Sequence, residues 1–594
     1  MDFVRKIMEK SLSVPVDEGP NKVTSLKEAV GRLVEPGMVI HAAATHSRPN
    51  AVMHEIIRRF WGADSGFTIV SLAFGYSWVA LVRGGLVKRI ISAFIGDHYP
   101  TPGPNPVLQK AYREGTITLE KWSMLSLSLR LMAAAMGVPF LPTRSIVGST
   151  MAEENVGSFV AVKDDASGRE LGLVHSLTPD LSIVHGLAAD RQGNTILTPP
   201  LGDNLYGAMA AWRGALVTVE RIVSTDFIRR YNHLVKLPGR YVSAVCEVPF
   251  GAHPTGVSNC YSVTGIHGYA EDYGFEEEVR SAARSEKVLD SWIHEWILSG
   301  SQTEYLAKLG PERLHYLKGK ADRGSWKVEI EPLLEEIAKP ALPTNSERLV
   351  AAAAEKLIKI IQDRRYDTIL AGVGIANLAA WLAAKKYKAG GGNVDLVAEI
   401  GFYGTHPQPA DPFVFNQRNL YTATMLTDIF PIMGILVSGS RNKSVGVFGA
   451  GQIDKFGNVN TTIIPETKTL LVGSGGANDA ACGANESLVT MVQEKDRMVE
   501  KVPYITSPGK RIKTLVTTHG IYEKLNAEDE FTLTAVLTAG ETPELETLVR
   551  KTKETCGWNL VVANEVKIIP PPELDDLTML RLWDPKGLFL KKGI

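Results

Sequence analysis

The sequence predicts an α/β protein with two homologous halves, each a mainly parallel sheet flanked by helices, and three observations support this. Short apolar strands alternate with amphipathic helices over about the first 250 residues, which is typical of parallel sheets with helices on both faces. The alternation restarts at Asp367 after an irregular stretch. An apolar strand followed by Asp-x-x-Gly-Asn occurs at Asp190 and again at Asp454, which indicates a duplicated domain.

The first half opens with a helix over 24–35 that Pro36 and Gly37 end. A short buried strand at 38–40, a loop of small residues and an amphipathic helix at 52–60 follow, and this order opens an α/β unit. Further strands are predicted at 67–72, 90–95, 116–119, 181–184 and 215–219, and a Leu-, Met- and Ala-rich helix over 123–136.

A connector separates the two halves. Residues 318–343 are charged, small and interrupted by prolines, which favours an irregular segment with one short helix at 333–337. The predicted domains are therefore 1–317, the connector 318–343 and 344–594.

The second half repeats the opening of the first. Thr344 and Glu347 form a capping box that begins a long helix. A strand at 367–370, another loop of small residues and a helix at 377–385 follow. We therefore expect two similar domains that pack face to face, with the functional site between them.

The composition excludes several classes of function. Of the 594 residues 44% are hydrophobic, and the net charge is −1, so a basic surface for nucleic acid is not expected. None of the four cysteines forms a C-x-x-C pair, so no zinc or redox motif is indicated, and so few cysteines fit a reducing compartment. The N-terminus lacks a signal pattern, and no apolar run approaches the ~20 residues of a membrane helix. We expect a cytoplasmic enzyme or binding protein without a membrane partner.

The stretch 394–407 contains the strongest candidate for a reactive group. An apolar strand leads into the carboxylate of Glu399, and Gly401, Gly404 and Pro407 follow. A carboxylate at a strand end, beside glycines that let the backbone and a ligand approach closely, is one way to present a nucleophile. The alternative interpretation is a solvent-facing glutamate before a glycine-rich loop.

A second glycine cluster follows the predicted strand near 470. Backbone N–H groups of Gly473, Gly475 and Gly476 have little side-chain cover and can form an anion-binding nest or an oxyanion hole. The spacing does not match the dinucleotide fingerprint G-x-G-x-x-G, and no Walker lysine follows. The alternative is a tight turn where a helix packs on a sheet.

These residues together resemble the class I CoA-transferases. In that family the catalytic glutamate lies in an E-x-G-x-x-G-x-x-P context, which Glu399 and the following 401–407 match. The segment 449–458, with Gly449 and Gln452 near its start, is similar to the family's G-A-x-Q-x-D-x-x-G-N. The loop 473–479 looks like its G-x-G-G-A-x-D. Three motifs in the same order are more specific than any one of them.

The resemblance extends over nearly the whole chain. The first half resembles the α subunit of glutaconate CoA-transferase and the second half its β subunit, so the chain looks like a fusion of the two. One departure concerns the loop 42–46, where many members have G-x-x-G-G-F and this sequence has Ala-Ala-Ala-Thr-His. Contacts between CoA and this loop are therefore not carried over.

The resemblance implies a ping-pong exchange of CoA between an acyl-CoA and a carboxylic acid, such as a dicarboxylic or 3-oxo acid. Glu399 would attack the thioester, form a mixed anhydride and then become a glutamyl-CoA thioester. A glutamate with an ordinary pKa of about 4.3 is ionised at pH 7 and needs no general base. CoA is then a substrate, and neither a metal nor a bound cofactor is required.

The other site residues receive roles from the same resemblance. The N–H groups of Gly475 and Gly476 are expected to stabilise the oxyanion, and Arg144 and Arg48 to bind a second carboxylate of the substrate, because a guanidinium binds carboxylates in a bidentate way. The acyl pocket is expected largely in the first half. Contacts with CoA are expected at Gly401, Gly404, Gly449, Gln452 and Gly473.

Two alternatives stay open. The two-subunit hydrolase that opens the last ring in bacterial steroid breakdown has a related arrangement, lacks the transferase glutamate and uses an acid after the strand that corresponds to 116–119. The segment 121–125 has no acid, although Glu120 is adjacent. A non-catalytic CoA or sugar-phosphate binder is the second alternative, and the Glu399 motif argues against it. Oligomers are common in the family, but the sequence itself does not specify one.

Overall fold

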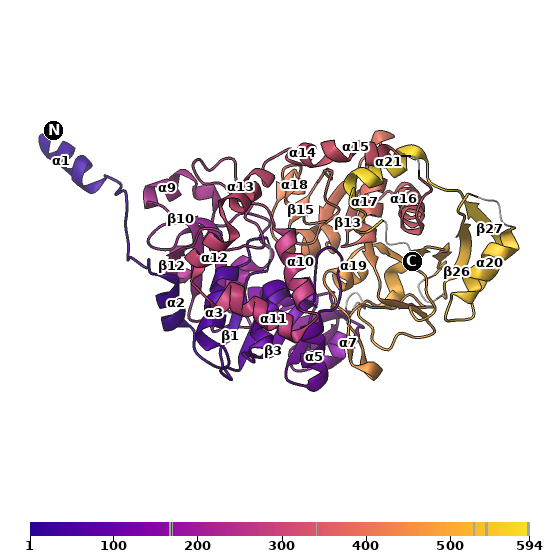
Figure 1. Cartoon of the computed structure of the whole chain (residues 1–594), viewed down its shortest axis with the longest axis horizontal. Coiled ribbons are helices and arrows are strands. Elements are labelled where there is room, and N and C mark those ends of the chain that lie inside the picture. Colours follow the sequence, from indigo (N-terminus) through magenta and orange to yellow (C-terminus); the bar gives the residue numbers. More distant parts are fainter. Residues whose placement is uncertain are drawn as a thin grey trace.

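The computed structural model describes residues 1–590 except 45, 166, 167, 169, 340, 527, 528 and 541–543. Each half contains one large sheet with helices packed on it, and the two halves lie side by side along the long axis of the molecule (Figure 1). In Figure 1 the first half is indigo to magenta and the second is orange to yellow. The predicted fold class, two α/β halves with mainly parallel sheets, is confirmed.

The sheet of the first half has parallel strands in the order β12-β10-β8-β1-β2-β3-β4. These strands are β1 (Val39–Ala42), β2 (Phe67–Phe74), β3 (Val87–Ile95), β4 (Thr118–Lys121), β8 (Leu181–Ala189), β10 (Ala215–Ile222) and β12 (Val242–Glu247). Every residue of β8 is buried, as expected for a central strand that is covered on both faces. The short strands β9 (Thr195–Ile196) and β11 (Val235–Leu237) extend one side in antiparallel fashion.

Helices cover both faces of this sheet. Apolar residues of several helices share one core cluster with β1, β2 and β3. These helices are α2 (Leu26–Leu33), α3 (Asn50–Phe60), α5 (Pro106–Glu114), α10 (Tyr273–Ala282) and α11 (Glu286–Ile293). On the other face lie α6 (Met124–Met136) and α8 (Asn204–Ala210). Alternate residues of one strand, such as Ile69 and Val70, therefore belong to different cores.

The sheet of the second half has the order β16-β15-β14-β13-β17-β22-β24-β25-β26-β27. Its parallel strands are β13 (Thr368–Ala371), β14 (Asp395–Ala398), β17 (Ser444–Gly449), β22 (Glu486–Met491) and β24 (Ile512–Thr517). The outer strands are β15 (Phe402–Tyr403), β16 (Met425–Leu426), β25 (Gly520–Glu523), β26 (Thr532–Leu537) and β27 (Val561–Ile569). The helices of this half are α16 (Asn345–Arg364), α17 (Ile375–Ala389), α19 (Ala477–Gly483), α20 (Leu545–Glu554) and α21 (Leu574–Trp583).

The strand orders show that the two halves repeat one topology. The series β14-β13-β17-β22-β24 in the second half corresponds to β2-β1-β8-β10-β12 in the first, with all neighbours parallel. In both, the first parallel strand leads through small residues into a helix, α3 or α17. The predicted capping box of Thr344 and Glu347 also forms at the start of α16.

The repeated Asp-x-x-Gly-Asn segments form the same turn. Asp190 accepts hydrogen bonds from the backbone of Asn194 at 2.9 Å and from its amide group at 2.8 Å. Asp454 accepts the equivalent bonds from Asn458 at 2.9 and 3.0 Å. Each asparagine oxygen then accepts a hydrogen bond at 2.9 Å from the N–H of a distant glycine, Gly239 or Gly509, just before β12 or β24. The duplication predicted from this motif is therefore visible in three dimensions.

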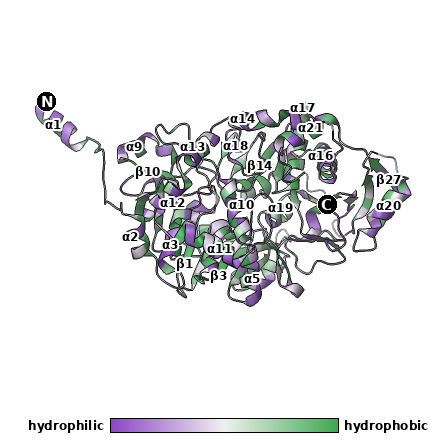
Figure 2. Ribbon diagram, viewed as in Figure 1, coloured by the Kyte–Doolittle hydropathy of each residue, from purple (hydrophilic) through white to green (hydrophobic). Residues whose placement is uncertain are grey.

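The halves share a hydrophobic core. Leu127 and Leu131 of α6 belong to the same cluster as Ile432 and Met433 of the second half. Figure 2 shows hydrophobic residues concentrated in the central strands and hydrophilic residues on outer helices such as α20. Because the halves bury apolar surface against each other, they form one continuous body.

The connector is more helical than the sequence predicts. It contains α14 (Trp326–Ile330) as well as the expected short helix, α15 (Leu334–Ala338), and α13 (Pro311–Lys320) extends into its start. Pro340 of the connector and Thr45 of the first small-residue loop lie outside the described residues. The helix α1 (Asp2–Ser11) projects from the left of the view in Figure 1. Within the described ranges, the helices are too short or too polar for a bilayer crossing.

Candidate functional site

Glu399 lies at an edge where the parallel strands of the second half end. It follows β14 directly, and the segments after β13, β17 and β22 meet at the same edge because these strands run parallel. A cavity of about 570 Å³ opens there, a size suited to a small-molecule ligand. Its second-half wall includes Glu399 and the loops 372–376, 449–451 and 473–477.

The opposite wall of the cavity comes from the first half. It consists of Phe94 at the end of β3, His98, the rigid turn 101–104 and Met124 at the start of α6. The cavity therefore lies between the halves, where the functional site was predicted. Both halves are needed to enclose it.

The carboxyl group of Glu399 has an unusual environment. The side chain is 5% exposed, and burial together with the nearby carboxyl of Asp479 raises the pKa of Glu399 to about 8. The expectation that Glu399 is ionised at pH 7 is therefore wrong for the ligand-free site, because the sequence does not reveal how completely folding removes water from this group. Perturbed carboxyl groups in cavities are typical of functional sites.

Gly476 touches the Glu399 carboxyl. A Cβ atom on Gly476 would lie 2.6 Å from Glu399 Oε2, so only glycine fits beside the carboxyl group in this arrangement. Gly401 is constrained differently: its φ of +131° and a clash of an added Cβ with Thr427 O at 2.2 Å both require glycine. The first glycine leaves room beside the reactive atoms, and the second permits the sharp turn that directs Glu399 inward.

The loop that carries Gly476 is held by the first half. Gly475 N–H donates to Ala93 O at 2.9 Å, and Ile95 N–H donates to Val472 O at 2.7 Å, so the loop continues the hydrogen bonding of β3. Gly475 N–H is thus already paired, contrary to its predicted role in an oxyanion hole. No backbone bond within the described chain uses Gly476 N–H, which leaves it as the candidate donor.

Asp479 connects this loop to α6. Its Oδ2 accepts a hydrogen bond from Leu125 N–H in the first turn of α6 at 3.0 Å, and burial raises the pKa of its carboxyl to about 6. Asp479 Oδ1 has no hydrogen-bond partner within the described residues. The side chain therefore places a second acidic group close to Glu399 while it caps a helix of the other half.

The predicted CoA contacts divide into two groups. Gly449 and Gly473 line the cavity, whereas Gly401, Gly404 and Gln452 are absent from its lining among the described residues. Gln452 is occupied elsewhere, because its oxygen accepts a hydrogen bond from Asn460 at 3.0 Å. Gly401 and Gly404 shape the turn after Glu399 instead of forming the wall.

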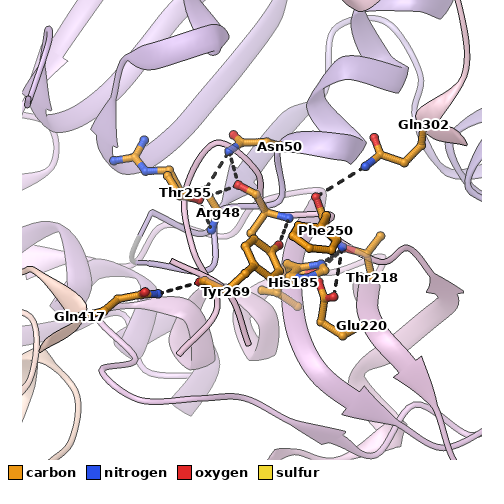
Figure 3. A network of polar contacts seen from close by, with 12 residues as sticks. Arg48, Asn50, His185, Thr218, Glu220, Phe250, Thr255, Tyr269, Gln302 and Gln417 are labelled. Carbon is orange, nitrogen blue, oxygen red and sulfur yellow. Dashed lines mark hydrogen bonds and ion pairs between the residues drawn. The ribbon is translucent and has the colours of Figure 1, made fainter. Parts of the chain in front are cut away.

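The predicted substrate arginines do not line the cavity. Arg48 is 4% exposed, donates to Ala73 O at 3.0 Å and lies over the rings of Tyr76 and Trp78. Figure 3 shows it beside Thr255, which accepts a hydrogen bond from Arg48 N–H, in a network of first-half residues. Arg144 is half-buried near the end of β5 (Phe140–Thr143) and also stays outside the described lining.

Several lining residues were not predicted from the sequence. The ring of His98 stacks on Phe94 at 4.2 Å and on Tyr76 at 4.9 Å, and burial holds the pKa of His98 well below its usual value. Ser474 is 5% exposed, and its hydroxyl has no hydrogen-bond partner in the described chain. The signal for Ser474 was its place inside the glycine cluster, whereas His98 reaches the site only through tertiary packing.

Arg497 is a further unpredicted lining residue. Its guanidinium donates to Gly451 O at 3.1 Å and to Ala450 O at 2.7 Å, so it fixes the loop after β17. It enters the sequence after β22, three strands from β14, or roughly 14 Å along the sheet edge from the strand that precedes Glu399.

Glu120, the acid of the hydrolase alternative, has a structural role here. Glu120 Oε1 accepts hydrogen bonds from Arg130 at 2.6 Å and from the Trp122 indole at 2.8 Å. Arg130 and the other cations around it lower the pKa of Glu120, although burial opposes this. The described lining of the cavity does not include Glu120. Nor do the described residues contain a cluster of His, Cys, Asp and Glu suited to a metal ion.

Comparison with known proteins places this geometry in a family. The family model described as Coenzyme A transferase matches residues 23–248. The first half is 31% identical over 294 residues to the first of the two subunits of 3-oxoadipate CoA-transferase of Pseudomonas knackmussii, which is 48% of this chain and 98% of that subunit. The chain belongs to the coenzyme A transferase family. The second subunit of the same enzyme is 29% identical over 261 residues, 41% of this chain and 94% of that subunit.

The two subunits of this relative thus correspond to two parts of one coenzyme A transferase chain. The predicted resemblance to a fused class I enzyme is confirmed. The cholesterol ring-cleaving hydrolase IpdA subunit of Mycobacterium tuberculosis is also 31% identical over 299 residues, 48% of this chain and 97% of that subunit. The acyl-CoA transferase YdiF of Escherichia coli O157:H7 shares the fold over 97% of this chain and 98% of that chain, with a TM-score of 0.62 and 14% identity.

Proposed function

We propose that this coenzyme A transferase moves CoA between an acyl-CoA and a carboxylic acid through a glutamyl-CoA thioester on Glu399. The observation that carries the proposal is the position of Glu399: a buried carboxyl group at a strand end, in contact with Gly476 and lining the cavity between the halves. Membership of the coenzyme A transferase family supports the reaction class.

The reaction proceeds in two balanced halves. A carboxylate oxygen of Glu399 attacks the thioester carbon, the carbon–sulfur bond breaks, and CoA thiolate leaves a mixed anhydride. The thiolate attacks the glutamyl carbonyl carbon, which releases the first acid and forms the enzyme thioester. The second acid then attacks this thioester, and the same steps in reverse deliver the new acyl-CoA and free Glu399.

The site lowers the barrier by position and electrostatics, because a carboxylate is a weak nucleophile. Gly476 N–H lies beside the carboxyl and is suited to donate to the oxyanion that forms at the attacked carbon. The buried Ser474 hydroxyl is a second candidate donor on the same loop. Phe94, Met124 and the other apolar lining residues exclude the water that would hydrolyse the anhydride and the thioester.

The buried position of Glu399 also has a cost. A pKa near 8 means that most of the free enzyme at pH 7 carries a proton on this group, so the proton must leave before attack. Once the CoA thioester forms, the charge is gone and the buried site no longer holds an uncompensated anion. Burial thus favours the covalent intermediate over the free carboxylate.

A covalent-adduct experiment tests the proposal. The enzyme is mixed with a panel of acyl-CoAs without an acceptor acid, and intact mass and peptide mapping are measured. We expect a CoA-sized adduct on the peptide that contains Glu399, and none on the Glu399→Gln variant, which is isosteric and lacks the nucleophile.

The products separate the alternatives. Free acid and free CoA that accumulate without an adduct would favour a thioester or ring-opening hydrolase, which the identity to the IpdA subunit makes the second candidate. Unchanged turnover by the Glu399→Gln variant would contradict the assigned nucleophile.

A further inference from the structure

We propose that the acyl site accepts apolar monocarboxylic acyl groups and discriminates against dicarboxylic ones, an inference that rests on the proposed transferase function. It deepens that function by naming the substrate class. It also departs from the sequence-based expectation, in which Arg144 and Arg48 receive a second carboxylate.

The first argument is the chemistry of the wall that faces Glu399. Met124 begins α6, and its N–H donates to Gly475 O at 3.1 Å, next to the glycine that touches Glu399. Phe94 and His98 continue this wall, and 101–104 closes it. None of these described first-half residues carries a charge at neutral pH, since the pKa of His98 is lowered well below its usual value.

The second argument is the position of the cations. Among all described residues of the lining, Arg497 is the only one with a permanent positive charge. Its guanidinium already donates to Gly451 O and Ala450 O, and it enters from β22 at the far end of the strand edge from Glu399. Arg48 is buried outside the cavity with its own carbonyl and ring partners.

The third argument is electrostatic and independent of the lining. Burial and the Asp479 carboxyl are the two causes that raise the pKa of Glu399, and no cation acts in the opposite direction. The reacting carboxyl therefore has no positive group close to it among the described residues. A second carboxylate on the acyl chain would meet a dry wall and an acidic neighbour, and burial of an unpaired carboxylate is strongly unfavourable.

The acids named in two relatives make the inference specific to this chain. 3-Oxoadipate and glutaconate each carry two carboxylates, and relatives named for these acids are 31% and 29% identical to the first half. The lining of this cavity predicts a different substrate class in spite of that similarity.

The test compares three donors of matched length: pentanoyl-CoA, glutaryl-CoA and the methyl ester of glutaryl-CoA. The ester has the size of the dicarboxylic donor without its charge. Rates of adduct formation on the Glu399 peptide are measured at one pH by quenched-flow mass spectrometry. We expect glutaryl-CoA to react roughly 100-fold or more slowly than pentanoyl-CoA, and the ester to recover most of the difference.

Each outcome bears on a different claim. Equal or faster reaction of glutaryl-CoA would overturn the inference while leaving the transferase function intact, and would assign the second carboxylate to backbone N–H groups such as those at 372–376. Slow reaction of both glutaryl-CoA and its ester would also overturn it, because size would then explain the selectivity. Absence of any adduct from all three donors, and from a wider panel, would instead contradict the proposed function.

A charge introduced into the wall provides a second test. Met124→Lys places a cation beside the acyl site, and Met124→Leu is the neutral control of similar size. We expect the ratio of glutaryl-CoA to pentanoyl-CoA reactivity to rise about 10-fold or more in Met124→Lys and to stay low in Met124→Leu. Equal ratios in the two variants, with both folded by circular dichroism, would argue against an acyl site at this wall.

Discussion

At the scale of single residues, the chemistry of this coenzyme A transferase depends on how folding changes Glu399. The sequence identifies the residue through its strand, glycines and proline, but the ordinary pKa of glutamate suggests an ionised group. The folded chain buries the carboxyl beside Asp479 and raises its pKa to about 8. A nucleophile that is mostly protonated at pH 7 makes the first half-reaction dependent on pH.

The pH dependence is therefore a direct prediction. The second-order rate of adduct formation should rise with pH and reach half its maximum near pH 8 in the free enzyme. Asp479→Asn keeps the acceptor for Leu125 N–H but removes the negative charge, so its midpoint should move to lower pH. The measurement is the rate of CoA labelling between pH 5.5 and 9.5.

A surface change serves as the control for this experiment. Glu153→Gln alters an exposed carboxyl away from the cavity and should leave the midpoint unchanged. A rate that is flat across the whole range, or an identical midpoint in Asp479→Asn, would show that these two carboxyl groups are not coupled.

The same raised pKa affects stability. Because the folded pKa of Glu399 exceeds that of an unfolded glutamate, the stability it contributes is present below pH 4.5 and is lost as pH rises through about 8. Glu399→Gln removes the ionisable group, so at pH 8 its free energy of unfolding should exceed that of the wild type, by on the order of 2 kcal/mol. The site thus sacrifices stability for reactivity.

At the scale of elements, the Asp-x-x-Gly-Asn turns carry the duplication. Asp190→Ala and Asp454→Ala should each lower the free energy of unfolding by about 1–3 kcal/mol, because each leaves buried N–H groups without an acceptor. Urea unfolding measures this, with the exposed Asp363→Ala as control. A loss in only one of the two variants would show that the turns are not energetically equivalent.

Local sequence predicts these elements well and their contacts poorly. The capping box at Thr344, the helix that became α6 and the parallel strands around Glu399 follow from periodicity, caps and turns. By contrast, Gly475 was assigned to an oxyanion hole, yet its N–H pairs with Ala93 from a strand of the other half. Such a contact joins residues far apart in the chain, so no local pattern reveals it.

The candidate site divides in the same way. Glu399, Gly449, Gly473 and Gly476 lie in or beside the cavity because their motifs describe the local geometry of strand ends. Arg48 and Arg144 were selected for the chemistry of their side chains, and the fold places them elsewhere. Residue type alone does not locate a side chain.

At the scale of the whole molecule, the shared core predicts that the halves stay together without the connector. A protease site inserted after the exposed Lys339 and cleaved in the folded protein should yield two fragments that co-elute. Since α6 packs on the second half and β3 bonds to the loop before Gly476, the fragments should also retain activity. Size-exclusion chromatography and the adduct assay measure both.

Separation of the fragments under native conditions would contradict this prediction. An uncleaved sample of the same insertion variant controls for the effect of the inserted site. Loss of activity only after cleavage, with the fragments still associated, would show that the connector itself shapes the cavity.

The connector has a further consequence for how the enzyme behaves at low abundance. Two separate subunits find each other less often as they are diluted, so their activity per mole falls below their dissociation constant. A covalent link holds each half near the other at an effective concentration that does not depend on dilution. Specific activity of the intact chain should thus persist in a cell that makes only a few copies, where a two-subunit relative would leave partners unassembled.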